Sequence, residues 1–355
     1  MSYFEDMKLK YENLRNKDNV VIVAIESSCD ETSVAVVRNG REVLSNIVSS
    51  QIPIHQRFGG VVPEVASRNH ITAISNVFEE ALKKAGITKD NIDAVAVTIG
   101  VGLIGALFVG VNFAKGLAYS LNVPLIAVNH IEGHLASNYI AYPSLEPPFA
   151  CLVVSGGHTS LFVINDYCEW KLVGQTMDDA IGECFDKVAR EVGLGYPGGP
   201  KVEKTAKSGQ NNIEFRKQNS FKHSYNFSFS GIKTAVINYI HNKKQTNQEI
   251  NVADICCSFQ TLVTKELVSK AIRLCQEKGI SKLVLAGGVS ANRFIANKMI
   301  DAGVKYGIEV FVPPVDLCTD NAAMVGCAGY YNMLAGKNLC DLDTIPTTVI
   351  SYTNL

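Results

Sequence analysis

Two histidines four residues apart are the clearest candidates for metal chemistry in this chain. They are His130 and His134, in the string His130-Ile131-Glu132-Gly133-His134. Residues four apart lie on one face of a helix, so both imidazoles can bind the same metal ion. The alternative is a pair of surface or capping histidines. The spacing resembles the H-E-x-x-H pattern of metalloproteases, but Glu132 lies roughly 200° around the helix from His130. It therefore points away from the shared metal, which disfavours a peptidase base.

Two histidines do not complete a metal site, so a third ligand must come from elsewhere in the chain. Asp320, in the string Cys318-Thr319-Asp320-Asn321, stands at a predicted junction between a loop and a helix. We expect it to be the third ligand. Two histidines and one carboxylate, with further positions open, suit Fe(II) or Zn(II).

Glycine-rich turns follow two of the predicted strands. They are Ser155-Gly156-Gly157 and Gly287-Gly288, and strand ends are where open α/β sheets place their ligands. Glycine lets backbone N–H groups approach an anion closely. Together with Asp30-Glu31-Thr32, these turns predict a nucleotide site. The alternative is three tight turns without a ligand.

A third glycine-rich string, Gly100-Val101-Gly102-Leu103-Ile104-Gly105, fits the dinucleotide fingerprint. The next predicted strand, 125–128, ends in Asn129-His130 and lacks the acid that would hold a ribose. We therefore expect these glycines to allow a helix to pack closely on a strand. The uncharged stretch 94–114 is long enough to span a bilayer, but its glycines favour a buried strand, a turn and a helix that begins near Gly102.

A row of acids is predicted on a helix over 178–192. Asp179, Glu183 and Asp186 fall on roughly one side of it, which is typical of a solvated helix face. The glycines Gly198 and Gly199, which follow it, could let a ribose or a carboxylate come close.

The elements that must position these residues occur in two similar series. The first has strands predicted over 20–25, 34–37 and 42–49, followed by an amphipathic helix over 67–85, and the second has strands over 150–154 and 161–164. Thr32-Ser33 and Thr159-Ser160 occupy the same place in both series. The repeat predicts two related lobes, each a sheet with helices, that face one another across a cleft. A helix over 253–278, a strand over 282–286 and a helix opening at 290–293 belong to the second lobe, and 201–250 reads as a polar insertion on it.

The composition is that of an ordinary globular chain. It has 355 residues, 47% of them hydrophobic, and a formal net charge of −1, which together favour two domains. A near-zero charge excludes a polycation, so a local patch or a partner must supply basic charge if nucleic acid is bound. Ten cysteines without a C-x-x-C pair predict buried thiols in a reducing cytosol. Residues 1–19 mix acids and bases, which predicts a short helical or frayed extension and argues against a secretory signal.

The chain resembles the TsaD family, once called the glycoprotease or O-sialoglycoprotein endopeptidase family. The strings that carry the resemblance are IESSCDETSVAVV, GGVVPEVASRNH, NHIEGH, VSGGHTSL, FDKVAREVGLGYPGGP, FSFSGIKTAV, LAGGVSANR and CTDNAAM. They run in family order from about Val20 to about Gly336. His158 indicates the bacterial or organellar branch. The chain departs from the family in residues 1–19 and in Gly100-Val101-Gly102, where the family usually has Gly-Pro-Gly; neither departure touches a ligand-binding position.

The resemblance implies an α/β, actin-like (ASKHA) duplicated fold with two lobes around a nucleotide cleft. The lobes would span 20–148 and 149–355, after the extension 1–19 and with the insertion near 201–250. The implied metal ligands are His130, His134 and Asp320, with one Fe(2+) per subunit and Zn(2+) possible. The implied substrate-binding residues are Val153, Val154, Ser155, Gly156, Gly157, Asp186, Gly199, Glu203 and Asn292.

The resemblance also implies an activity and partners. The activity is transfer of a threonylcarbamoyl group from threonylcarbamoyl-AMP to the exocyclic amine of the adenosine 3′ of the anticodon in tRNA. The partners are a TsaB-like paralogue and a TsaE-like P-loop ATPase, in the cytoplasm and without a membrane. The carbamoyl carbonyl of a mixed anhydride is already activated, so no protein nucleophile is assigned. A metallopeptidase and an actin-like small-molecule kinase stay open as alternatives.

Overall fold

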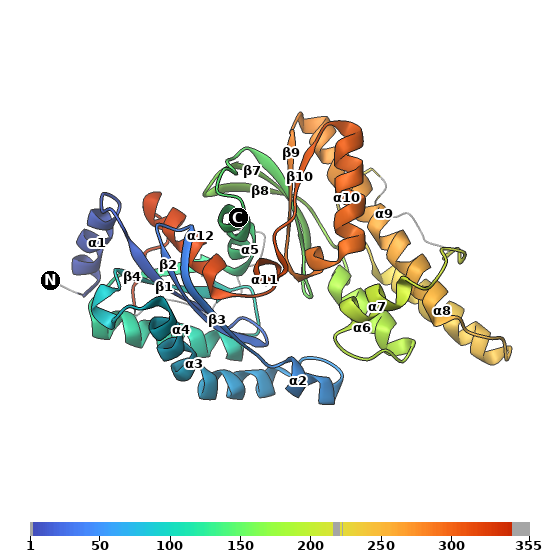
Figure 1. Cartoon of the computed structure of the whole chain (residues 1–355), viewed down its shortest axis with the longest axis horizontal. Coiled ribbons are helices and arrows are strands. Elements are labelled where there is room, and N and C mark those ends of the chain that lie inside the picture. Colours follow the sequence, from blue (N-terminus) through green and yellow to red (C-terminus); the bar gives the residue numbers. More distant parts are fainter. Residues whose placement is uncertain (1–2, 216–220, 222, 343–355) are drawn as a thin grey trace. The chain divides into compact units, whose positions relative to one another are not determined.

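The computed structural model describes residues 3–215, 221 and 223–342 of the chain (Figure 1). These residues form two compact units. The first unit contains the chain up to Leu145 and the segment from Thr319 onward, and the second contains Glu146–Cys318.

The first unit is built on a five-stranded sheet in the order β3-β2-β1-β4-β5. The strands are β1 (Val21–Glu26), β2 (Glu31–Arg38), β3 (Glu42–Ser50), β4 (Ala94–Gly100) and β5 (Leu125–Asn129). β1, β2 and β3 pair as antiparallel neighbours, whereas β4 and β5 are parallel to β1. Helices cover both faces of the sheet, so β1 is apolar at five successive positions and wholly buried.

The helices of the first unit are α1 (Tyr3–Leu14), α2 (Ile52–His55), α3 (Pro63–Ala85), α4 (Ile104–Leu121), α5 (His130–Ala141) and α12 (Ala322–Leu334). α3 and α4 pack their apolar residues on the face that carries Val23 and Val95. α12 lies against the opposite face, where a Cβ on Gly326 would come 3.3 Å from the Cβ of Ala24. α1 confirms a helical N-terminal extension, which buries Met7 and Tyr11.

The second unit repeats the sheet of the first. Its order is β10-β9-β6-β7-β8, and the strands are β6 (Phe149–Val154), β7 (Thr159–Asp166), β8 (Glu169–Gln175), β9 (Lys282–Ala286) and β10 (Glu309–Phe311). β6 is antiparallel to β7 and parallel to β9, just as β1 is antiparallel to β2 and parallel to β4. The predicted repeat and the duplicated α/β fold are therefore confirmed.

The helices of the second unit are α6 (Ile181–Glu191), α7 (Gly198–Ala206), α8 (Ser230–Gln245), α9 (Val252–Lys278), α10 (Arg293–Tyr306) and α11 (Val315–Cys318). Their core includes an edge-to-face pair of Phe185 and Phe259, whose ring centroids are 5.0 Å apart. The stretch 201–250 was expected to be a polar insertion. Within its described part, α8 buries Ile232, Val236 and Ile240, because one stripe of the helix is apolar.

Two expected boundaries that bear on the candidate site differ from the structure. The second lobe was expected to run from 149 to 355, but α12 belongs to the first unit because it packs on β1, β2 and α5 (Figure 1). The acidic helix was expected to start at Asp178, but α6 begins at Ile181. The side chain of Asp178 instead accepts hydrogen bonds from the N–H groups of Phe229 and Ser230. Asp179 therefore precedes the helix rather than lying on it. The predicted opening of a helix at 290–293 is confirmed, since α10 begins at Arg293 after a 3-10 turn over Gly288–Ala291.

The glycines before and within α4 have the packing role that the sequence predicts. A Cβ on Gly102 would lie 2.6 Å from the carbonyl oxygen of Ser28, and one on Gly110 would collide with the Ser27 hydroxyl. α4 is long and apolar enough to cross a membrane by length and composition. Its Val111 and Ala114 are buried in the core of the first unit.

All ten cysteines are free thiols, and six of them are buried.

Candidate metal centre and substrate loops

The first turn of α5 places the two histidines. The helix begins at His130, directly after β5, because Asn129 caps it and accepts a hydrogen bond from Ile131 N–H at 2.9 Å. Glu132 completes the capping box, and its Oε2 accepts from Asn129 N–H at 3.4 Å. Burial raises the pKa of Glu132 to about 7. The carboxylate thus faces the start of its own helix, as the sequence predicts, and not the histidine pair.

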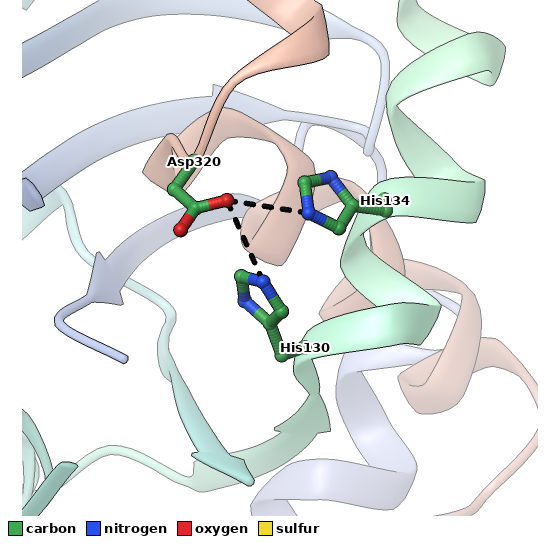
Figure 2. Close-up of side chains that lie close together, drawn as sticks. All are labelled: His130, His134 and Asp320. Carbon is green, nitrogen blue, oxygen red and sulfur yellow. Dashed lines mark ion pairs between the residues drawn. The ribbon is translucent and has the colours of Figure 1, made fainter. Parts of the chain in front are cut away.

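Asp320 reaches the two histidines from the segment before α12. Asn321 caps α12 by accepting a hydrogen bond from Met324 N–H at 3.2 Å, which fixes the chain next to Asp320. The Oδ1 atom of Asp320 lies 3.2 Å from Nε2 of His134 and 3.5 Å from Nε2 of His130 (Figure 2). One ligand atom from each residue lies within 4.8 Å of the other two. The structure therefore brings together all three predicted ligands within one unit.

The surroundings of His134 fit a bound cation. Its side chain is completely buried, and neither ring nitrogen has a hydrogen-bond partner among the described residues. Its Nε2 lies near Asp320 but not in hydrogen-bonding geometry. A buried polar group without a partner is costly, whereas two imidazoles and a carboxylate are a common ligand set for divalent transition metals. The group could therefore hold a metal ion.

A second carboxylate lies on the other side of His130. Glu26, the last residue of β1, is completely buried, and its Oε2 is 3.1 Å from Nδ1 of His130. Burial opposes charge on both groups. The Coulomb attraction and hydrogen bond of His130 nevertheless hold the pKa of Glu26 below its usual value. Asp320 and Glu26 in turn raise the pKa of His130 to about 9 in the metal-free protein. Sequence reasoning missed Glu26, although a carboxylate at the end of an apolar strand was a signal.

The loop Ser155–Gly157 joins β6 to β7 and lies on the first turn of α6. Gly182 N–H donates to the Ser155 carbonyl and Glu183 N–H donates to the Gly156 carbonyl, each at 3.2 Å. Gly156 and Gly157 are exposed, and a Cβ on either would meet no atom of the described residues within 4 Å. Their backbone is thus open to a ligand.

Val153 and Val154 lie in β6 and are completely buried. Their side chains therefore cannot reach a ligand, and only their backbone groups could. Strand β9, which is parallel to β6, ends at Ala286, and the turn after it begins at Gly287 with a φ of +87°. A Cβ there would lie 2.5 Å from the Val154 carbonyl oxygen. The two glycine turns that the sequence singled out therefore meet at one edge of this sheet.

The remaining candidates form two groups in the second unit. In the first, Asp186 Oδ1 accepts a hydrogen bond from Gly198 N–H at 2.6 Å, which holds the start of α7 and Gly199 next to α6. In the second, Glu203 accepts from the N–H of Arg293 at 3.0 Å, and Asn292 caps α10. The amide of Asn292 also donates to Gln260 at 3.0 Å. Asn292 and Glu203 thus hold the α10 terminus in the structure.

The duplicated sheets and the histidine–aspartate group define an actin-like α/β protein with a candidate metal centre. HypF from T. kodakarensis shares this fold at a TM-score of 0.60 and 14% identity, over 90% of this chain and 48% of that one. Component A of (R)-2-hydroxyglutaryl-CoA dehydratase from Acidaminococcus fermentans matches at a TM-score of 0.52 and 12% identity, over 89% of this chain and 99% of that one. At such low identity these likenesses show the fold alone.

Sequence comparison gives the family. The profile described as TsaD, tRNA N6-adenosine threonylcarbamoyltransferase, matches residues 42–327. A protein of that name from Clostridium perfringens (strain ATCC 13124) is 57% identical over 321 residues, which are 90% of this chain and 95% of the relative. One from Clostridium botulinum (strain Kyoto) is 54% identical over 332 residues, which are 93% and 98% of the two chains. The chain belongs to the TsaD family and is an acyltransferase that acts on N6 of a tRNA adenosine. The comparisons support this activity better than a peptidase or a kinase.

Proposed function

We propose that this chain takes the threonylcarbamoyl group from threonylcarbamoyl-AMP and transfers it to N6 of the adenosine 3′ of the anticodon. The acceptors would be tRNAs that read ANN codons, and AMP would be released. The observation that carries the proposal is the convergence of His130, His134 and Asp320 in a chain of this family. His134 is completely buried, lies 3.2 Å from Asp320 and makes no hydrogen bond to any described residue, which is the environment expected of a metal ligand.

The metal that we propose is one Fe(2+) per subunit, with Zn(2+) as the other candidate, held by His130, His134 and Asp320. Both ions suit two imidazoles and one carboxylate. When bound, such an ion supplies a Lewis acid that can polarise a carbonyl or clamp a phosphate.

The acyl-adenylate would bind to the second unit. The proposed residues are Val153, Val154, Ser155, Gly156, Gly157, Asp186, Gly199, Glu203 and Asn292. Gly156 and Gly157 are exposed, and no atom of the described residues lies within 4 Å of the place of a Cβ on either, so a phosphate or the threonyl carboxylate can approach their backbone. Donors in that place can also steady negative charge that develops during transfer. The mixed anhydride is already activated, so the adenosine amine attacks the carbamoyl carbon directly and AMP leaves, without a protein nucleophile.

The proposed setting is the cytoplasm, with a TsaB-like paralogue and a TsaE-like P-loop ATPase as partners. The formal net charge of −1 supports the need for partners. Affinity for tRNA comes largely from basic groups on phosphates, and this chain has no overall excess of them.

Mass spectrometry of tRNA nucleosides tests the proposal in cells that carry this chain. Depletion of the protein should remove threonylcarbamoyladenosine from tRNA. The wild-type chain should restore it, and the His134→Ala variant should not. An unchanged nucleoside content after depletion would refute the proposed activity.

A further inference from the structure

The imidazole of His130 lies between two carboxylates. Its Nε2 faces Oδ1 of Asp320 at 3.5 Å (Figure 2). Its Nδ1 lies 3.1 Å from Oε2 of Glu26 and 3.2 Å from the Ser28 hydroxyl. The hydroxyl can donate or accept a hydrogen bond, whereas an ionised carboxylate can only accept one, so Glu26 is the partner that requires a proton on Nδ1. Neutral imidazole carries one proton, so the nitrogen that does not bear it is the one that can bind a metal. Whatever hydrogen-bonds to Nδ1 therefore decides whether Nε2 presents a lone pair to the metal position.

Glu26 is held in place from two directions. The Thr98 hydroxyl donates to its Oε2 at 2.6 Å, and the backbone N–H of Ser28 donates to its Oε1 at 2.5 Å. All three residues are at most 2% exposed. Both oxygens of the carboxylate thus have donors already, and Oε2 has room for one more from His130.

We propose that Glu26 is a positioning residue for the metal ligand His130. It holds the imidazole proton on Nδ1 and turns the lone pair of Nε2 toward Asp320 and His134. This inference rests on the metal site of the proposed function. Carboxylates that fix a histidine ligand in this way are worth 10- to 100-fold in metal affinity. Glu26 and Asp320 together also bring two negative charges to a buried site, which matches a divalent cation.

A conservative change of Glu26 should move the imidazole proton of His130 from Nδ1 to Nε2. In Glu26→Gln, the N–H of Ser28 still needs an acceptor, so the amide oxygen takes the place of Oε1. The amide NH2 group then takes the place of Oε2 and donates to Nδ1 of His130. This puts the imidazole proton on Nε2, which is the nitrogen that faces the metal position.

The experiment measures the Co²⁺ affinity of the full chain by competition with a chelator. Glu26→Gln should bind Co²⁺ about 10- to 100-fold more weakly than the wild type. The matched control is Glu132→Gln, since Glu132 is also buried, lies two residues from His130 and faces away from the pair. Glutamine is a good residue at that capping position, so the control should keep wild-type affinity. Wild-type affinity in Glu26→Gln, or an equal loss in both variants, would overturn the role of Glu26.

If Glu26→Gln does not fold, two further measurements test whether Glu26 positions His130. Thr98→Val removes one donor from Glu26 at nearly constant volume, and it should weaken Co²⁺ binding several-fold; an unchanged affinity would contradict the proposal. In the Zn²⁺-loaded wild type, the Nδ1–H proton of His130 should exchange slowly with water and be visible by NMR, and its absence would also contradict it. Failure of the wild type to bind any metal would instead refute the metal site of the proposed function.

Discussion

At the scale of single residues, His134 is the side chain whose surroundings point most directly to a metal. His134→Ala should abolish metal binding and transfer while the fold is kept, since the imidazole makes no hydrogen bond to any residue that the structure describes. Elemental analysis and circular dichroism of the purified variant measure the two effects. The control is His241→Ala, which removes a histidine side chain that is 55% exposed in the second unit. Full metal occupancy in His134→Ala would rule out this ligand assignment.

The proposed acyl-adenylate site can be tested at Gly156. A valine should fit there without disturbing the fold, because in the part of the chain that the structure describes no atom lies within 4 Å of the position that its Cβ would take. Its bulk should nevertheless keep a ligand from the backbone N–H groups. We expect threonylcarbamoyl-AMP to bind at least about tenfold more weakly, which is about 1.4 kcal/mol, with unchanged metal content.

Calorimetry on metal-loaded protein provides that measurement. Gly231→Ala is the control, since Gly231 also has open space around it but lies at the start of α8. If Gly156→Val binds the acyl-adenylate as tightly as this control does, the ligand does not sit on the Ser155–Gly157 loop.

At the scale of elements, Asp178 joins the segment before α6 to the start of α8. It accepts hydrogen bonds from two backbone N–H groups and from the hydroxyls of Ser228 and Ser230. Burial alone would raise the pKa of Asp178, but these hydrogen bonds hold it below its usual value. A lowered carboxyl pKa contributes stability that is present above the unfolded-state pKa and is lost as the pH falls through the folded-state value.

Asp178→Ala should therefore destabilise the protein above about pH 4 by about 1 kcal/mol, as the loss of a helix cap does. The difference from the wild type should shrink in more acidic solution. Urea unfolding at a series of pH values from neutral to acidic measures it. A constant difference over the whole series would show that the charge of Asp178 does not contribute.

Most strands and helices could be predicted because local patterns decide them. The apolar run before Glu26 and the one before Ser155 each predict a buried strand. Each is followed by a polar turn and a second apolar run, and this similarity predicted the duplication. The start of α6 could not be predicted, since Asp178 caps a helix some fifty residues later in the chain. The return of α12 to the first unit depends on long-range packing against β1 and α5, which no local pattern encodes.

The residues of the candidate site were likewise predictable only where a local pattern marks them. The spacing of His130 and His134 predicted a shared helix face. Asp320 was predicted as the third ligand because it stands at a junction between a loop and a helix. Glu26 escaped notice because its role depends on β1 and β5 lying in one sheet, which brings its carboxylate next to His130. Asn292 was expected to bind substrate, whereas its hydrogen bonds cap α10 and hold Gln260. Its place in substrate binding is still a prediction.

At the scale of the whole molecule, the near-neutral charge limits what this chain can do alone. With a formal net charge of −1, it should bind tRNA weakly by itself. Binding should become tighter when the two partner proteins are added, and it should weaken as salt is raised, because phosphate contacts release counterions. Fluorescence anisotropy with labelled tRNA measures both effects. Tight binding by the isolated chain that does not respond to salt would contradict this expectation.

Reconstitution of the reaction is the most direct test of the proposed transfer. Metal-loaded protein, its two partners, threonylcarbamoyl-AMP and unmodified tRNA are mixed, and the AMP and the digested nucleosides are quantified by mass spectrometry. The wild type should form AMP and threonylcarbamoyladenosine in equal amounts, and His134→Ala should form neither. Release of AMP without modified adenosine in the wild type, or equal transfer by His134→Ala, would contradict a metal-dependent threonylcarbamoyl transfer to tRNA.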